Sequence, residues 1–378
     1  MKKRRSDVRE GTPEGNPPAA AKDAGMDGPR KPKVGIPRAL HYFRFFPFWK
    51  KLLEELGAEV VVSPPTNKKV VEEGVTHGFG ELCLPVKVYY GHVFRMMREN
   101  PDLDFLFVPR YVSEWTDAYF CPKFLSLPDV IKIIPGVPRL LSLTVNVKER
   151  PTSLSVVEMA RYLGKDELEA LRAYRVAKEY YGEYLAYLRG GAPVNHALRL
   201  VENGRPLKPL PSRPPKEVYL LLLGHGYNLF DSFVNLDFQK KLKKLGVDYL
   251  TLENLPERVF RAPVVINRHL RNYWGHEEEI LAATRYYLTK GRREIDGVIF
   301  LVSFACGPDS LMSELIMRDL KLVGIPYLNI IMDEHTGEAG MLTRVESFVE
   351  MIKRKKRKER AAGTGGVAVE STTARSVG

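Results

Sequence analysis

The fold is indicated most clearly by residues 298–310, which read VIFLVSFACGPDS. The run from Val298 to Phe304 is almost continuously apolar, and a Gly-Pro pair follows Cys306. Residues 311–322 then have the spacing of a helix. A continuous apolar run beside an amphipathic helix is typical of a strand in a parallel sheet that is covered on both faces.

The same alternation of strands and helices runs through the rest of the second half. The strands predicted are 218–223 and 327–332, and the helices predicted are 236–245, 277–288 and 342–352. Gly246 follows the first of these helices as a C-terminal glycine would.

The first half of the chain alternates in the same way. The strands predicted are 34–36, 60–62, 105–108 and 130–134, and the helices predicted are 48–56 and 86–97. A longer helix is expected between a capping-box pair, Asp166 and Glu169, and Gly190. We interpret its apolar stripe, from Leu168 to Leu188, as core packing.

A proline-rich stretch separates the two halves. Five prolines lie in residues 203–216, which is typical of a semi-rigid linker. We therefore predict an α/β protein with two Rossmann-like doubly wound parallel-sheet domains, 34–202 and 217–352, with a cleft between them. Ligands of such folds bind at the carboxyl ends of the strands, and often between domains.

The net charge of +12 belongs mainly to the ends of the chain. Residues 1–33 hold nine Lys or Arg and five Asp or Glu, and residues 353–378 hold eight and two, so the tails carry +4 and +6. Both tails are predicted to be disordered. The basic run 353–358 can contact phosphates, but no groove-reading motif accompanies it, so a specific nucleic-acid role is disfavoured.

The sequence also indicates the compartment. Its longest apolar runs are far shorter than a membrane span, and no apolar stretch follows the basic residues 2–5 to form a secretory signal. Three cysteines in 378 residues exclude a disulfide framework and fit a reducing compartment. We expect a cytoplasmic protein without membrane contact.

The three cysteines have similar surroundings. They lie in ELCLPVK (81–87), YFCPK (119–123) and FACGPDS (304–310). Each has a proline one or two residues later and precedes an expected helix. A helix N-terminus favours a thiolate, because its N–H groups carry partial positive charge, and Lys87 and Lys123 add positive charge nearby.

Two interpretations of these cysteines follow from the pattern. Their separations of 38 and 185 residues exclude a local zinc knuckle, whose ligands come in close pairs. Cys83, Cys121 and Cys306 can instead hold three irons of a 4Fe–4S cluster and leave the fourth iron open. Alternatively, they are three small buried hydrophobic side chains. The pattern alone leaves both interpretations open.

Polar residues after two predicted strands are further candidates. His335 and Glu338 follow the strand 327–332 and are predicted to supply acid or base groups near the cysteines, or hydrogen bonds that tune a cluster. The alternative is a tight turn in which Thr336 and Glu338 cap the last helix. A single metal ion at Asp333, His335 and Glu338 is less favoured, because alternate residues of a turn rarely converge.

The segment 224–228, GHGYN, follows the strand 218–223, and its glycines would let a phosphate or a cluster approach the backbone. It lacks the spacing of the dinucleotide fingerprint, so NAD binding is disfavoured. We expect His41, His77 and His92 to be structural, and residues 274–277 to start a helix.

Several of these motifs together resemble a known family. They are residues 35–49, the box Glu81-x-Cys83-x-Pro85-x-Lys87 with Gly91-His92, CPK (121–123), GHGYN (224–228) with Asp231, ACGPDS (305–310), and 333–340 with Thr343-Arg344. Over residues 34–352 the chain is similar to the activase-associated branch of the 2-hydroxyacyl-CoA dehydratase superfamily, the CoA-substrate-specific enzyme activase-related proteins.

The resemblance implies an iron–sulfur cluster between two Rossmann-like domains, with Cys83, Cys121 and Cys306 as its ligands. The cluster would be of the 4Fe–4S type, or a double-cubane variant as in a sister group. In the dehydratases, a dimer of related subunits accepts one electron from an ATPase activator of the actin-like fold. Ketyl radical chemistry then removes water from a 2-hydroxyacyl-CoA. This chain has no activator ATPase segment and no motif that we assign to CoA, so the resemblance carries over the fold and the cluster rather than the dehydratase reaction.

Three hypotheses of function follow. The first is an iron–sulfur redox protein that takes low-potential electrons from an ATP-dependent activator and works as a homodimer or with a related subunit. The second is a non-catalytic assembly or regulatory module that docks on the activator or the dehydratase. The third is a CoA-ester dehydratase that acts alone.

Overall fold

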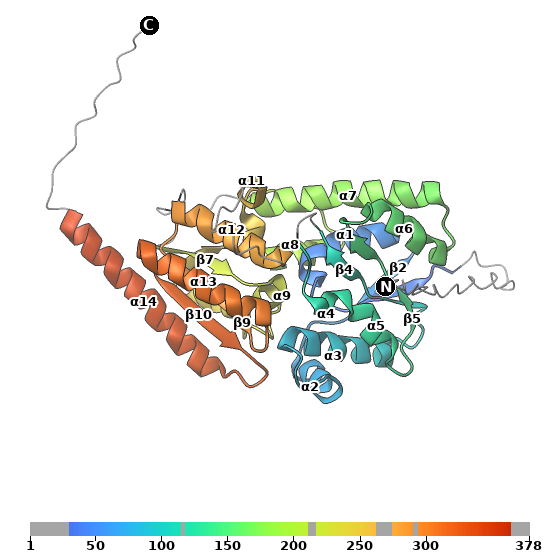
Figure 1. Ribbon diagram of the computed structural model, residues 1–378, viewed down its shortest axis with the longest axis horizontal. Helices are drawn as coiled ribbons and strands as arrows, with labels where there is room; N and C mark the ends of the chain where they lie inside the picture. Colours follow the sequence, from blue (N-terminus) through green and yellow to red (C-terminus); the bar gives the residue numbers. More distant parts are fainter. Residues whose placement is uncertain (1–29, 115–117, 211–216, 262–273, 290–293, 364–378) are drawn as a thin grey trace, which may run out of the picture.

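The computed structural model describes residues 30–114, 118–210, 217–261, 274–289 and 294–363. These residues contain one four-stranded parallel sheet in each half of the chain (Figure 1). The first sheet has the order β2-β1-β3-β5, and its strands are Glu59–Val62, Lys33–Ile36, Phe105–Phe107 and Arg139–Leu141. The second has the order β10-β9-β7-β8, and its strands are Tyr327–Met332, Gly297–Ser303, Val218–Leu223 and Val247–Leu250.

The two sheets have the same topology. Counted along each half, the strand order is 2-1-3-4 in both. The second strand is added on one side of the first, and the later strands are added on its other side, so the strand order reverses beside the first strand. Open α/β sheets bind ligands at such a reversal, at the carboxyl ends of the strands. The predicted class, two Rossmann-like parallel-sheet units, is confirmed. The reversal of strand order therefore predicts a ligand site at two positions, the carboxyl ends of β1 and β3 and the carboxyl ends of β7 and β9.

The first half adds a two-stranded parallel ribbon and eight helices among the described residues. The ribbon consists of β4 (Arg110–Ser113) and β6 (Thr144–Asn146). The helices are α1 (Tyr42–Glu55), α2 (Lys68–His77), α3 (Leu84–Glu99), α4 (Pro122–Leu125), α5 (Leu127–Lys132), α6 (Thr152–Ala160, followed by the 3₁₀ turn Arg161–Leu163), α7 (Glu167–Arg189) and α8 (Val194–Glu202).

The long helix α7 starts as predicted. The backbone N–H of Glu169 donates to Asp166 Oδ1 at 2.8 Å, and that of Asp166 donates to Glu169 Oε2 at 3.0 Å, which is a capping box. The expected stripe is wrong at its first two positions, since Leu168 is 78% and Leu171 is 37% exposed. The buried face begins at Ala170 and continues to Leu188, because the small side chains of α7 lie against α1.

The strand predicted at 130–134 is wrong. Most of its residues belong to α5. This helix has a proline in its first turn, where proline is tolerated. Asp129 in the first turn and Lys132 in the last turn also stabilise a helix, because their charges oppose those of the helix dipole. Ile131 and Ile134, three apart, are buried, whereas Ile133 between them is 72% exposed. That spacing is helical, and the fourth strand is β5, shortly afterwards.

The second half covers both faces of its sheet. Its helices are α9 (Gly226–Phe230), α10 (Phe238–Lys244), α11 (Arg258–Arg261), α12 (Gly275–Thr289), α13 (Gly307–Val323) and α14 (Glu338–Gly363), with a 3₁₀ turn at Leu252–Asn254. Leu221 and Phe300 pack on one face with α12 and α13. Leu220 and Ile299 point to the other face, where they join the core of the first half. Burial on both faces explains the continuously apolar strands.

The predicted disorder of 353–378 is wrong up to residue 363. Helix α14 continues through the basic run, and its lysines bond to the second sheet unit. Lys356 Nζ lies 2.7 Å from a carboxylate oxygen of Asp296, and Lys353 Nζ donates to the Leu245 carbonyl at 3.0 Å. The remaining parts of the predicted tails and linker, 1–29, 211–216 and 364–378, lie outside the described residues.

The two halves are packed against each other through buried and partly buried polar contacts as well as the shared core. Arg44 of α1 lies 2.6 Å from Glu279 of α12 and 3.1 Å from Glu114. Thr66 donates to Asp231. No helix among the described residues has the length and apolar character needed to cross a bilayer.

The Glu114 carboxyl makes stability depend on pH. Burial raises the pKa of Glu114 to about 7, and Glu279 raises it too, although Arg44 opposes them. The folded protein therefore binds a proton that the unfolded chain, with a pKa of 4.5, has lost, so stability falls as pH rises between these two values. We expect Glu114→Gln to stabilise the protein by about 1–3 kcal/mol at pH 8 and by little at pH 4.5.

Urea unfolding at the two pH values measures this difference. Glu72→Gln is the control, because the Glu72 side chain is 61% exposed, and it should change neither value. A Glu114→Gln protein less stable than the wild type at pH 8 would contradict the expectation.

Candidate metal centre

The reversal of the second sheet carries a histidine and a cysteine. His225 begins α9 just after β7, and Cys306 begins α13 just after β9, the parallel neighbour of β7. Gly224 between β7 and His225 has φ +139, and a Cβ there would lie 2.7 Å from the Leu301 carbonyl oxygen. Glycine lets the chain turn tightly at this point. The expected position at the carboxyl ends of the strands is confirmed for both residues.

All three cysteines begin helices, as predicted. Cys83 caps α3, Cys121 caps α4 and Cys306 caps α13, each with proline in the first two helical positions. None of the three cysteine side chains makes a capping hydrogen bond to its helix. The backbone N–H groups of Lys123 and Asp309 nevertheless lie close enough to act on the pKa values of Cys121 and Cys306.

Two of the thiols lie near one buried tyrosine, Tyr227 of α9, and the third lies near one of those two. Cys83 and Cys306 both raise the pKa of Tyr227 electrostatically, and Cys83 raises the pKa of Cys121 in the same way. Glu277 of α12 acts on both Tyr227 and Cys121. Cys83 and Cys306 are 8% and 9% exposed, and Cys121 is half-buried. Segments that are far apart in sequence therefore bring three shielded sulfur donors into one region.

His225 lies between two carboxylates in this region. Its Nε2 lies 3.1 Å from Asp309 Oδ1 and 3.4 Å from Glu277 Oε1. One ligand atom each of His225, Cys306 and Asp309 lies within 4.8 Å of the others. Burial lowers the pKa of His225, but the Asp309 charge, together with nearby Cys306 and Glu277, raises it overall, well above 6.5. The ring thus favours its charged form between two carboxylates.

The pKa values of the thiols differ from the prediction. We expected the helix starts and lysines to lower their pKa values, and the nearby backbone amides do act in that direction on Cys121 and Cys306. Burial nevertheless raises the pKa of Cys121, and burial together with the Asp309 charge raises that of Cys306 to about 11. Both are protonated at neutral pH, so a metal bound there has to displace their protons.

Two neutral histidines connect His225 to the first half. The His276 ring centroid lies 5.1 Å from that of His225 and 5.3 Å from that of His41, and His41 lies 4.0 Å from the ring of Phe124, on the helix that Cys121 caps. Burial, then the Arg44 charge, lowers the pKa values of His41 and His276 well below 6.5. The Nε2 atoms of both rings are buried without a hydrogen-bond partner in the described part of the chain.

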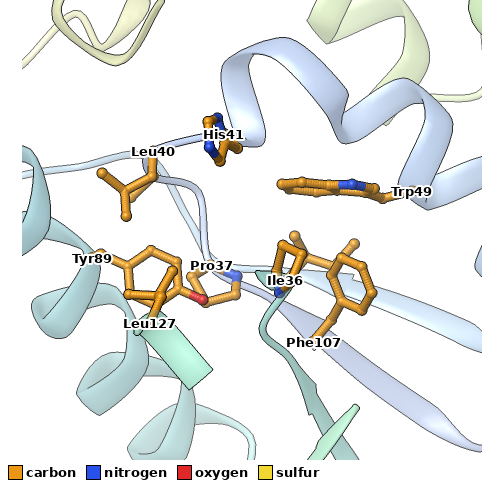
Figure 2. Close-up of a pocket in the computed structure, with 10 residues that line it drawn as sticks. Ile36, Pro37, Leu40, His41, Trp49, Tyr89, Phe107 and Leu127 are labelled. Atoms are coloured by element: carbon orange, nitrogen blue, oxygen red, sulfur yellow. The ribbon is translucent and has the colours of Figure 1, made fainter. Parts of the chain in front are cut away.

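A small apolar pocket adjoins His41 at the ends of β1 and β3. Figure 2 shows the rings of Trp49, Phe107 and Tyr89 around Ile36 and Pro37. The full lining is Ile36, Pro37, Ala39, Leu40, His41, Trp49, Tyr89, Phe107, Pro109 and Leu127. Its cavity volume of about 10 Å³ leaves room for one water-sized group, far less than a CoA ester needs.

His335 and Glu338 lie at the surface. The Glu338 side chain is 65% exposed and lies 3.0 Å from Lys241 Nζ. Thr336 exchanges hydrogen bonds with Asp333, so it closes the turn instead of capping α14. A role for His335 and Glu338 remains a prediction.

The neighbouring Glu334 instead contacts the helix of Cys83. Its carboxylate lies 2.7 Å from the ammonium of buried Lys87, in the first turns of α3. The positive charge that we expected Lys87 to contribute near the cysteines is therefore offset by a carboxylate. Sequence reasoning missed Glu334 because the direction of a turn residue is not set by a periodic pattern.

Comparison with known proteins gives two family matches. The model of the CoA enzyme activase uncharacterised domain matches residues 33–255, more than half of the chain. The chain belongs to this family. The model of the 2-hydroxyglutaryl-CoA dehydratase D-component matches residues 288–352. No curated protein matches the chain.

The two matches together span the candidate centre. The CoA enzyme activase match contains Cys83, Cys121 and His225, and the dehydratase D-component match contains Cys306 and Asp309. They confirm the resemblance to the 2-hydroxyacyl-CoA dehydratase and activase system. The CoA enzyme activase domain extends past the proline-rich stretch to the 3₁₀ turn after β8, so this family unit includes the start of the second half.

Proposed function

We propose that this protein is an iron–sulfur redox protein of the 2-hydroxyacyl-CoA dehydratase and activase system. It holds a 4Fe–4S-type cluster at Cys83, Cys121 and Cys306 and accepts low-potential electrons from an ATP-dependent activator of the actin-like fold. The observation that carries the proposal is that three cysteines from both halves of the chain each begin a helix, with Cys83 and Cys306 near Tyr227 and Cys121 near Cys83.

The chemistry of the donor set fits this group. Three thiols are soft ligands suited to iron–sulfur clusters, and each lies at a helix N-terminus, whose partial positive charge favours a negative cluster. The positive ring of His225 offsets part of the charge of Asp309 and Glu277. A bound cluster would supply one-electron transfer.

The protein's own residues would control access to the centre. Burial of Cys83 and Cys306 limits contact with water and oxidants. The raised pKa values of Cys121 and Cys306 mean that cluster insertion releases protons. Three cysteines leave one iron of a 4Fe–4S cluster without a protein thiol, available to a small ligand.

Strictly anaerobic purification, followed by assay of iron and acid-labile sulfide, tests the proposal. We expect about four irons and four sulfides per chain, with visible absorbance that bleaches with dithionite. Mixing with an activator should give the same bleaching only when ATP is present, and samples without ATP or without activator are the controls.

Other results would select other functions. No iron after anaerobic reconstitution would make the cysteines structural and support a regulatory module. About one metal ion per chain without sulfide would point to a single ion at His225, Cys306 and Asp309. A cluster that no ATP-dependent activator reduces would contradict the electron-accepting role.

A further inference from the structure

His225, Cys306 and Asp309 form a group of three metal-binding side chains, of which the proposed cluster uses only Cys306. One ligand atom of each residue lies within 4.8 Å of the other two. All three side chains are buried. The group therefore places a nitrogen, a sulfur and an oxygen donor close together and away from solvent.

The fold brings these three donors together through two neighbouring strands. β7 and β9 are parallel neighbours, and His225 precedes α9 after β7 while Cys306 precedes α13 after β9. Asp309 follows Cys306 by three residues in the first turn of α13, a spacing that places two side chains on one side of a helix.

The Asp309 carboxylate is the observation that points to a ligand. Its side chain is 0% exposed, and neither of its oxygens has a hydrogen-bond partner among the described residues. Oδ1 lies 3.1 Å from His225 Nε2, but the two groups are not aligned as a hydrogen bond. Buried carboxylates are costly unless they are paired with hydrogen bonds or coordinate a metal.

The charges around His225 also favour a cation. Glu277 Oε1 lies 3.4 Å from the same Nε2, so two carboxylates share one histidine. Within the part of the chain that the structure describes, no lysine or arginine forms an ion pair with Asp309 or Glu277. A divalent ion would supply positive charge that this group lacks.

We propose that His225, Cys306 and Asp309 bind one divalent zinc ion when the chain holds no cluster. Zinc accepts nitrogen, sulfur and carboxylate ligands together, at about 2.0–2.3 Å. Two ligands of one tetrahedral ion are then roughly 3.3–3.8 Å apart, close to the 3.1 Å between Nε2 and Oδ1. The inference goes beyond the proposed function and does not rest on it, because it needs neither Cys83 nor Cys121.

The zinc ion and the cluster would exclude each other, since Cys306 belongs to both donor sets. Glu277 lies outside the group of three, so the fourth position on zinc would be taken by water. On binding, the Cys306 thiol and the coordinating nitrogen of His225 give up any proton that they hold to solvent.

Zinc titration of the full chain tests the inference, after a chelator has removed all metal under anaerobic, reducing conditions. A chromophoric chelator competes for the zinc and so measures the affinity and the number of ions per chain. Asp309→Asn and His225→Gln each remove one ligand. Cys83→Ser is the matched control, because Cys83 also begins a helix and is also buried but is not in the group.

We expect about one zinc ion per wild-type chain, and an affinity lower by roughly tenfold or more in Asp309→Asn and in His225→Gln. Cys83→Ser should bind zinc as the wild type does, although the proposed function predicts that it loses the cluster. Cobalt(II) bound in place of zinc should show thiolate-to-metal charge-transfer absorption in the wild type and in Cys83→Ser, but not in Cys306→Ser. Circular dichroism checks that each variant is folded.

Absence of zinc binding by the wild type, or unchanged affinity in both ligand variants, would overturn the inference. Loss of zinc from Cys83→Ser would also overturn it, because the ion would then lie among the cysteines. If a ligand variant does not fold, the cobalt spectra decide, and a spectrum without thiolate charge transfer rejects the site. Failure of the proposed function is recognised separately, since the wild type would then form no cluster whether or not it binds zinc.

Discussion

Replacement of Cys306 by serine is expected to reduce bound iron and sulfide by more than tenfold. Serine has nearly the shape of cysteine, so α13 should still begin after β9, but a hydroxyl is a far poorer ligand for iron than a thiolate. Cys83→Ser and Cys121→Ser should behave alike if the three sulfurs share one cluster.

The measurement is iron and acid-labile sulfide per chain after anaerobic reconstitution. Ser313→Ala is the matched control, because Ser313 is buried on the same helix and donates to the Ser310 carbonyl, and it should retain full iron. Full iron content in all three cysteine variants would contradict the proposal that these cysteines bind a cluster. Loss in only one of them would restrict the metal to a smaller site.

The second large effect is expected at Gly91, where two helices touch through their backbones. A Cβ at Gly91 of α3 would lie 1.9 Å from the Val70 carbonyl oxygen of α2, and a Cβ at Gly74 of α2 would lie 1.9 Å from the Lys87 carbonyl oxygen of α3. Backbone atoms cannot move aside as the end of a flexible side chain can. Gly91→Ala should therefore force α2 and α3 apart and lower the free energy of unfolding by about 3 kcal/mol.

Chemical denaturation of Gly91→Ala beside Gly182→Ala measures this effect. Gly182 lies inside α7 with nothing near its added Cβ, so alanine there should stabilise the protein by about 0.5–1 kcal/mol. Because Cys83 caps α3, a displaced α3 should also reduce the iron content of Gly91→Ala. A Gly91→Ala protein as stable as the wild type would show that the two helices can separate without cost.

The parts of the fold that the sequence predicted are those with strong local causes. The strand before Cys306 is a long apolar run, and α7 begins with a capping box, which acts within four residues. The prediction of a strand at 130–134 was wrong because a short apolar run is compatible with either a strand or a helix until its neighbours are known. Helix α14 was predicted too short, since the contacts of Lys353 and Lys356 come from residues distant in sequence.

The candidate centre was predictable only in part. The cysteines carried a repeated local signal, a proline in the following helix, but nothing local connects His225 to Glu277 or Asp309. A weak clue to Asp309 existed, because it follows Cys306 by three residues and so lies in the first turn of the same helix. His225 and Glu277 reach it only through the packing of the second sheet unit. His41 was expected to be structural, and its ring packs against Phe120 and Phe124, although its buried Nε2 has no hydrogen-bond partner among the described residues.

The distance along the chain between the cysteines has a consequence for synthesis. Cys306 follows Cys83 by 223 residues. At about 5–20 residues per second, a ribosome needs roughly 10–45 s to reach the third cysteine after the first. For most of that interval Cys83 and Cys121 have been made while Cys306 and α13 have not. The nascent first half is therefore the stage at which stray metals and oxidants have the easiest access to these two thiols.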